Sequence, residues 1–328
     1  MLVMRKSQME AFENVVAQRF EEGLLDHLRT FFPQHAATLG ETQLGRIARY
    51  GLQRAESRGL KTERAIYLYV ALMFVLGSRF DEDPQLPWAA REIEEEKPAP
   101  PKPEVAAEAR DAATVAATAG EMVTGKEDEA PKETADARIE RVYGQAMAFL
   151  DQTVGPDNEL LRQTLNTLRQ PQVFEGLPAA PSVGHRLLLL LQMLAPEKYD
   201  MLGEETLRNL VRHGYEAAKR YGMTTEHGIM NYVALAFVLG SGFDRDPLYP
   251  WAAAALSDQG PVDPAKKGVA LREAALVHLA KCLPGCPRRA EQSAVILARP
   301  AQPYKQIVEG IGEQTRRPLY TSTSAQGG

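Results

Sequence analysis

Apolar residues recur at helical spacing along most of the chain, so the predicted elements are helices. Residues 41–58 place an apolar side chain every three or four positions, which is typical of a helix with one buried face. Residues 62–76 are apolar on every side, which predicts a central helix surrounded by protein. The same pattern predicts helical segments at 7–32, 139–152, 158–169, 183–194, 269–281 and 304–314.

Glycine and threonine mark the boundaries of the central helices. Gly59 and Gly222 each follow a predicted helix, at a position where glycine with positive φ closes the last carbonyl groups. Thr62 and Thr225 stand at the N-cap of the next helix, each followed by a glutamate that suits the positive helix end. This order predicts a tight αα-hairpin.

The hairpin occurs twice in the chain. The stretch "YVALMFVLGSRFDEDPQLPWAA" begins at Tyr69, and "YVALAFVLGSGFDRDPLYPWAA" begins at Tyr232, 163 positions later. With this constant offset and no gaps, 28 of 52 residues are identical between 39–90 and 202–253. Likeness at this level indicates duplication of one helical module.

A segment of different composition separates the copies. Residues 94–137 are rich in proline, alanine and charge and contain no aromatic residue. Such a segment buries too little apolar area to offset the entropy of ordering, which predicts a disordered linker. The chain is therefore expected to be all-α, with helical module 1 at 1–93, the linker at 94–137, helical module 2 at 138–258 and a basic, partly helical tail at 259–328. A linker of this kind allows the modules either to pack together or to act separately.

Composition narrows the function classes. The net charge of −5 and the pI of about 5.8 argue against a nucleic-acid-binding protein, because such proteins usually carry a basic surplus. The longest apolar runs have about 13 residues, whereas a bilayer-spanning helix needs about 20, so no membrane insertion is expected. The N-terminus lacks the apolar core of a signal peptide and the chain has two cysteines, which predicts a cytoplasmic location.

Each repeat ends in the motif F-D-x-D-P-x-x-P-W. One interpretation is a metal or ligand loop, but the glycine and the distant glutamate of an EF-hand loop are missing. A reversing turn explains the motif better, since aspartate bonds nearby backbone N–H groups, proline fixes the bend and the aromatic rings pack onto the helices. A third interpretation is a partner-facing surface, because tryptophan is enriched at interfaces. The candidate partner-binding residues are Phe80, Asp81, Asp83, Trp88, Phe243, Asp244, Asp246 and Trp251.

A weaker candidate for chemistry lies near the C-terminus. His278, Cys282 and Cys286 are spaced H-x₃-C-x₃-C and would share one face of a continuous helix, which suggests zinc. Pro284 and Gly285 interrupt that helix and no fourth ligand is evident, so a pair of free thiols explains the spacing better. No cofactor is expected, and no motif of a nucleophile elbow or a zinc-protease helix occurs.

The first module resembles a group of small helical proteins encoded beside spike and effector genes of bacterial type VI secretion systems. The marks of the resemblance are Gly59-x-x-Thr62-Glu63 and the motif that ends at Trp88, and it covers about 1–90 and, through the repeat, about 202–253. The resemblance implies an accessory role in effector loading or effector neutralisation, with no catalytic residue to carry over. This chain departs from that pattern by its doubled module and its basic tail.

The sequence is compatible with four functional hypotheses. The leading hypothesis is a non-enzymatic adaptor or chaperone, which holds a secreted effector or a spike component through the surfaces of the helical modules. The second is an immunity protein that neutralises a cognate effector. The third is an enzyme with a site in 138–200 or in the tail, and the fourth is a scaffold that self-associates through equivalent module surfaces.

Overall fold

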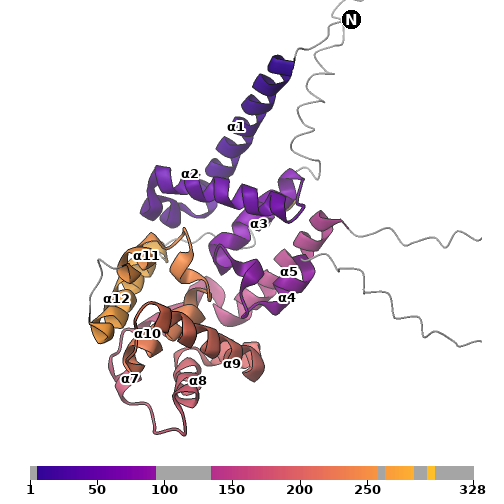
Figure 1. The fold of residues 1–328 in the computed structure, drawn as a ribbon. Helices are drawn as coiled ribbons and strands as arrows, with labels where there is room; N and C mark the ends of the chain where they lie inside the picture. Colours follow the sequence, from indigo (N-terminus) through magenta and orange to yellow (C-terminus); the bar gives the residue numbers. More distant parts are fainter. Residues whose placement is uncertain (1–5, 94–133, 258–262, 284–293, 300–328) are drawn as a thin grey trace, which may run out of the picture.

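The computed structural model describes residues 6–93, 134–257, 263–283 and 294–299, and every regular element in these ranges is a helix. The all-α class predicted from the sequence is therefore confirmed for this part of the chain. Figure 1 shows the helices gathered into one body, from which the N-terminal part of α1 (Lys6–Phe31) extends. Within the same ranges, no helix has both the length and the apolar character needed to cross a bilayer.

The helices form two bundles of the same design. The first bundle consists of α1, α2 (Pro33–Ser57), α3 (Glu63–Leu76), α4 (Pro87–Ile93) and α5 (Ala135–Thr153). The second bundle consists of α8 (Val183–Leu194), α9 (Pro196–Arg220), α10 (Glu226–Leu239), α11 (Pro250–Leu256) and α12 (Pro264–Cys282). The connection between them carries the short helices α6 (Glu159–Leu168) and α7 (Gln172–Glu175).

The central helices are α3 and α10, as the sequence predicts. Both have 14 residues, and all but three of the residues in each are buried. Thr62 and Thr225 cap them, each through a side-chain oxygen that accepts a backbone N–H at 3.2 Å. Gly59 has φ 76°, and the N–H of Leu60 donates to the carbonyl of Ala55, which is the predicted closure of the preceding helix.

The duplication extends further than sequence identity shows. Helices α2, α3 and α4 begin and end 163 positions before α9, α10 and α11. Helices α5 and α12 both have 19 residues but are 129 positions apart, and only two of their paired residues are identical. Seven paired positions are nevertheless buried in both helices: 139 and 268, 142 and 271, 143 and 272, 146 and 275, 149 and 278, 150 and 279, 153 and 282. A fifth helix thus completes each bundle.

The bundle boundaries differ from the predicted module boundaries. Most of helix α5 falls within the range predicted for the second module, yet Ile139, Val142 and Phe149 lie in the hydrophobic core of the first bundle. Helix α12 falls within the predicted tail, yet Leu271 and Leu279 lie in the core of the second bundle. In both cases the helix after α4 or α11 returns to cover the apolar surface of the central helix, whatever the length of the intervening chain.

The predicted linker and tail are only partly described by the structure. Residues 94–133 lie outside the described ranges, and helix α5 begins at Ala135, within the last residues assigned to the linker, because Thr134 caps it. The predicted helix at 269–281 is confirmed and begins earlier, at Pro264. The predicted helix at 304–314 lies outside the described residues. The segment 294–299 contacts the first bundle, where Arg299 pairs with Glu63 at 2.5 Å and lies over the ring of Tyr67.

Candidate functional site

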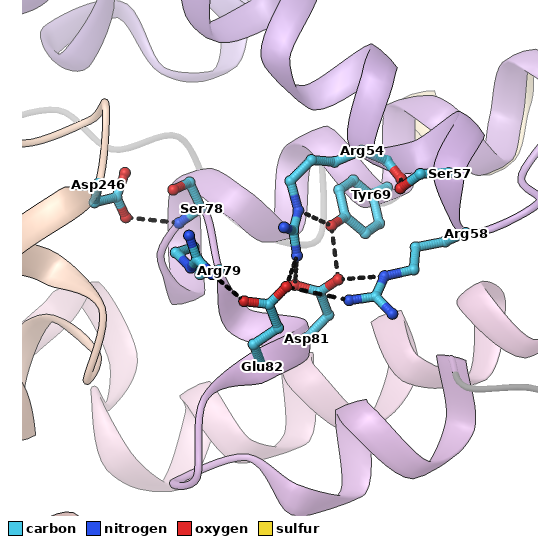
Figure 2. Close-up of polar contacts among 9 residues, drawn as sticks. All are labelled: Arg54, Ser57, Arg58, Tyr69, Ser78, Arg79, Asp81, Glu82 and Asp246. Carbon is cyan, nitrogen blue, oxygen red and sulfur yellow. Dashed lines mark hydrogen bonds and ion pairs between the residues drawn. The ribbon is translucent and has the colours of Figure 1, made fainter. Parts of the chain in front are cut away.

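The first aspartate of the motif anchors a charged cluster in the first bundle (Figure 2). Asp81 has no exposed side-chain surface, and its two oxygens contact Arg54 at 2.5 Å and Arg58 at 2.8 Å. The hydroxyl of Tyr69 donates to the same carboxylate at 3.0 Å. Burial raises the pKa of Tyr69, and the neighbouring Asp81 carboxylate raises it further. The cluster therefore fixes the turn after α3 to the end of α2.

The second bundle keeps the aspartate but changes its partners. Asp244 accepts a hydrogen bond from the hydroxyl of Tyr221 at 2.8 Å, and Tyr221 stands where the first bundle has Arg58. The pKa of Tyr221 is raised to about 12, mainly by burial and secondly by its hydrogen bond to Asp244. The first aspartate is thus kept with different partners in the two bundles, and these partners are side chains rather than the nearby backbone N–H groups expected from the sequence.

The second aspartate of each motif joins the two bundles. Asp83 accepts the backbone N–H of Ser241 at 2.8 Å, and Asp246 accepts that of Ser78 at 2.7 Å (Figure 2). Each carboxylate also accepts an N–H two residues further along its own loop. Burial raises the pKa of both carboxyl groups, although these N–H bonds act in the opposite direction. The contact is reciprocal, as in a two-fold symmetric dimer, so the bundles pack together as a fused pair.

The aromatic residues of the motif have internal contacts. Phe80 and Phe243 are buried in the two cores. Trp88 and Trp251 are half-buried, the former with its ring centroid 6.3 Å from that of Phe149 and the latter 5.9 Å from that of His278. The partner-binding role of the motif stays a prediction, and the structure gives its aromatic and acidic side chains only internal contacts.

Only part of the weak metal candidate can be placed. The Sγ of Cys282 lies 3.5 Å from Nε2 of His278, and both residues are buried in α12. Burial lowers the pKa of His278 to about 4, with a smaller effect from Lys281. Cys286 lies outside the described residues. Within the described ranges, no group of three or more histidine, cysteine, aspartate or glutamate side chains is placed to hold a metal ion.

A cavity of about 220 Å³ lies between the two bundles. It is bounded by the first turns of α2 and α9, the last turns of α3 and α10, and the ends of α5 and α12. Residues at equivalent positions of the two bundles line it together. Among these pairs are Phe74 and Phe237, Val75 and Val238, Leu76 and Leu239, Leu150 and Leu279, Thr153 and Cys282, and Val154 and Leu283.

One pair of residues makes this cavity asymmetric. Lys198 and His35 both line it and are 163 positions apart. The Nζ of Lys198 donates to the carbonyl of Phe237 at 2.5 Å and lies 5.0 Å from the centre of its ring. Burial lowers the pKa of Lys198 to about 8, although the Asp83 carboxylate opposes this, and burial lowers that of His35 to about 4. At neutral pH the cavity therefore holds a cation on Lys198 and a neutral ring on His35.

A second hollow lies on the outside of the second bundle, between α8 and α9. This α8–α9 groove has a volume of about 430 Å³ and is lined by residues of 182–188 and 208–215. Leu187 and Val211 form a buried apolar floor, while Val183 keeps 36% of its surface exposed. Its apolar lining suits the apolar side chains of a bound peptide segment.

Cations line one wall of this groove. Arg208 and Arg212 line the groove, and Lys219 lies two turns further along α9, with its Nζ 4.3 Å above the ring of Tyr215, which also lines the groove. Arg208 is paired with Glu204 at 2.6 Å, whereas Arg212 contacts only the amide oxygen of Asn209 among the described side chains. This wall therefore presents positive charge beside an apolar floor.

The first bundle lacks this combination at the equivalent place. Gly45 and Glu56 stand where α9 has Arg208 and Lys219, and Arg49, the equivalent of Arg212, is neutralised by Glu21 at 2.7 Å. Phe20, the equivalent of Val183, is buried. The bundles thus share their interiors and differ at this groove.

Sequence reasoning missed Lys198, His35 and the α9 cations. The signal for the first pair was present, because the 163-residue offset that aligns Pro33 with Pro196 also aligns His35 with Lys198. The α9 cations could have been found from the spacing of Arg208, Arg212 and Lys219, which places them along one side of a helix. Neither the cavity nor the groove follows from these patterns without the packing.

No protein-family model matches the chain, and neither a curated protein nor a solved structure matches it significantly. The contacts and shapes of the described residues are therefore the basis for a functional proposal.

Proposed function

We propose that the protein is a non-enzymatic adaptor that holds a protein client, and that an acidic amphipathic helix of the client occupies the α8–α9 groove. The observation that carries this proposal is the divergence of the two bundles at the groove. Their interiors retain the same caps and aspartates, whereas among the described residues only the second bundle combines this apolar groove with an arginine, Arg212, that has no carboxylate partner.

The chemistry of the groove supports an acidic helix as the occupant. An amphipathic helix binds by placing apolar side chains into a groove, with anchors three or four residues apart. Arg212 and Lys219 lie one and three turns along α9 from Arg208, so carboxylates on the flank of a docked helix would meet them in turn. Such charge complementarity steers the encounter and selects the partner.

The resemblance of the first module to type VI secretion accessory proteins suggests what the client is. We propose a secreted effector, or a spike component, encoded next to this chain. An immunity protein would use the same groove but would protect cells from the effector without aiding its export.

The test is co-expression of the tagged full-length chain with the products of its neighbouring genes, followed by affinity capture. We expect one product to be retained by the wild type and lost with Arg212→Glu and with Leu188→Asp. Arg49→Glu in the first bundle is the matched control and should retain the client, because it changes the equivalent position outside the groove. Capture of no neighbouring product, or equal capture by Arg212→Glu and the wild type, contradicts the proposal. Protection of cells from a captured toxin, with export unchanged, would favour the immunity role.

A further inference from the structure

We propose that the cavity between the bundles binds a small organic carboxylate, with its apolar body among the paired aromatic and aliphatic walls and its carboxylate on Nζ of Lys198. This inference does not depend on client binding, because the cavity and the α8–α9 groove share no residue.

The size and walls of the cavity suit an apolar body. Its volume of about 220 Å³ exceeds the roughly 150 Å³ of an engineered apolar cavity that holds benzene. The rings of Phe74 and Phe237 and the side chains of Leu76 and Leu239 line it from both bundles. A ligand with a ring or a chain of about eight carbons would replace empty space with contacts on both sides.

Lys198 suits the charged end of the ligand. A lysine ammonium has three donors, and the described residues provide an acceptor for one of them, the carbonyl of Phe237. No described carboxylate lies within 4.0 Å of the Nζ. The nearby Asp83 carboxylate is already occupied by N–H groups of Gln85 and Ser241. A ligand carboxylate would therefore supply the partner that the buried ammonium lacks.

Strained backbone at one wall of the cavity supports a binding role. Asp157 and Asn158 have φ of 51° and 61°, and they are the only non-glycine residues with positive φ in the described ranges. Both line this cavity. Such strain tends to occur at ligand clamps and active sites, where the surrounding structure holds it in place.

The experiment is isothermal titration of the full-length protein with octanoate at pH 7, with 1-octanol as the neutral probe. We expect saturable 1:1 binding of octanoate and weaker binding of octanol, because only octanoate can pair with the ammonium. Lys198→Met should weaken octanoate binding by at least tenfold, the equivalent of losing one charge-assisted hydrogen bond. Lys267→Met is the matched control, since it removes a lysine whose Nζ also donates to a backbone carbonyl, that of Tyr221 at 3.2 Å, but which lines neither the cavity nor the α8–α9 groove. It should bind octanoate like the wild type.

A second variant locates the site independently of the lysine. Val238→Phe fills the cavity while leaving Lys198 in place, and we expect it to abolish octanoate binding. The circular dichroism spectrum and cooperative unfolding of each variant establish that it is folded. Absence of octanoate binding to the wild type at millimolar concentration overturns the proposal. So does equal binding of octanoate by the wild type and folded Lys198→Met.

Discussion

Lys198 is expected to cost the folded protein stability, and its replacement by methionine tests this. The pKa of its side chain is about 8 in the folded protein and 10.5 as the ordinary value. Each pKa unit corresponds to 1.36 kcal/mol, so the buried lysine disfavours folding by about 3 kcal/mol at pH 7. Methionine keeps the contact with the Phe237 ring but leaves the Phe237 carbonyl without its donor, which costs about 1–2 kcal/mol. Lys198→Met should therefore raise the free energy of unfolding by about 1–2 kcal/mol at pH 7.

The pH dependence is the sharper measurement. Between pH 8 and pH 10.5 the unfolded chain holds the proton of Lys198 and the folded chain releases it, so wild-type stability rises with pH in this window. The advantage of Lys198→Met should accordingly shrink by about 2 kcal/mol between pH 7 and pH 9.5. The other titratable groups that line the cavity are unchanged in the variant: His35, Asp83, Asp157, Tyr249 and Cys282.

Urea unfolding followed by far-ultraviolet circular dichroism measures this difference at pH 7, 8, 9 and 9.5. Tyrosines titrate in the unfolded state of both proteins and cancel in the comparison. Lys267→Met serves again as the control, because it removes a lysine that does not line the cavity. A Lys198→Met advantage that is independent of pH, or a variant less stable than wild type at every pH, would refute the reasoning.

Three further predictions concern the turns and the junction between the bundles. Asp246→Ala leaves the backbone N–H groups of Ser78 and Leu248 without an acceptor. It should lower the free energy of unfolding, measured in urea at pH 7, by about 2–4 kcal/mol. A change below about 0.5 kcal/mol would show that water replaces the carboxylate. Asp81→Asn weakens the pairing with Arg54 of α2 and with Arg58, which follows α2, and should cost about 2–4 kcal/mol by the same measurement, with a melting temperature equal to wild type as the contrary result. Cleavage at a protease site inserted within 94–133 separates α1–α4 from α5 and the rest of the chain. Both fragments should stay in one complex on size-exclusion chromatography, because residues of α5 lie in the core of the first bundle. Separation of the fragments would show that the covalent connection holds α5 in place.

The sequence predicts the repeated hairpin well because the same residues perform the same local task twice. Gly59, Thr62 and the second aspartate of the motif each make a hydrogen bond to a residue a few positions away, so the local pattern is sufficient to predict these bonds. The structural equivalence of α5 and α12, by contrast, cannot be found by sequence comparison. Only the burial of seven positions is kept, and the intervening chain changes the offset from 163 to 129.

The candidate sites depend on long-range packing, which the sequence pattern does not contain. The cavity brings together residues as far apart as Phe31 and Leu283. Asp83 and Asp246 were predicted to bond their own loops and do so, but their second bonds cross between bundles and depend on how the bundles dock. The groove depends on the exposure of Val183, whose equivalent Phe20 is buried in the other copy.

Fusion of the two copies in one chain allows equivalent positions around the cavity to carry different side chains. In a symmetric dimer of single modules, a lysine at the Lys198 position would occur twice around a cavity of about 220 Å³. Two ammonium groups in one low-dielectric space repel each other, and each would also carry the cost of burial. A duplicated chain can keep the lysine on one side and a neutral histidine, His35, on the other. The reciprocal aspartate contacts stay symmetric because they only bind backbone, whereas the positions that face the cavity are free to differ. Replacing His35 by lysine should therefore restore the symmetric arrangement, destabilise the folded protein relative to His35→Met, and do so most strongly at low pH, where both ammonium groups are charged.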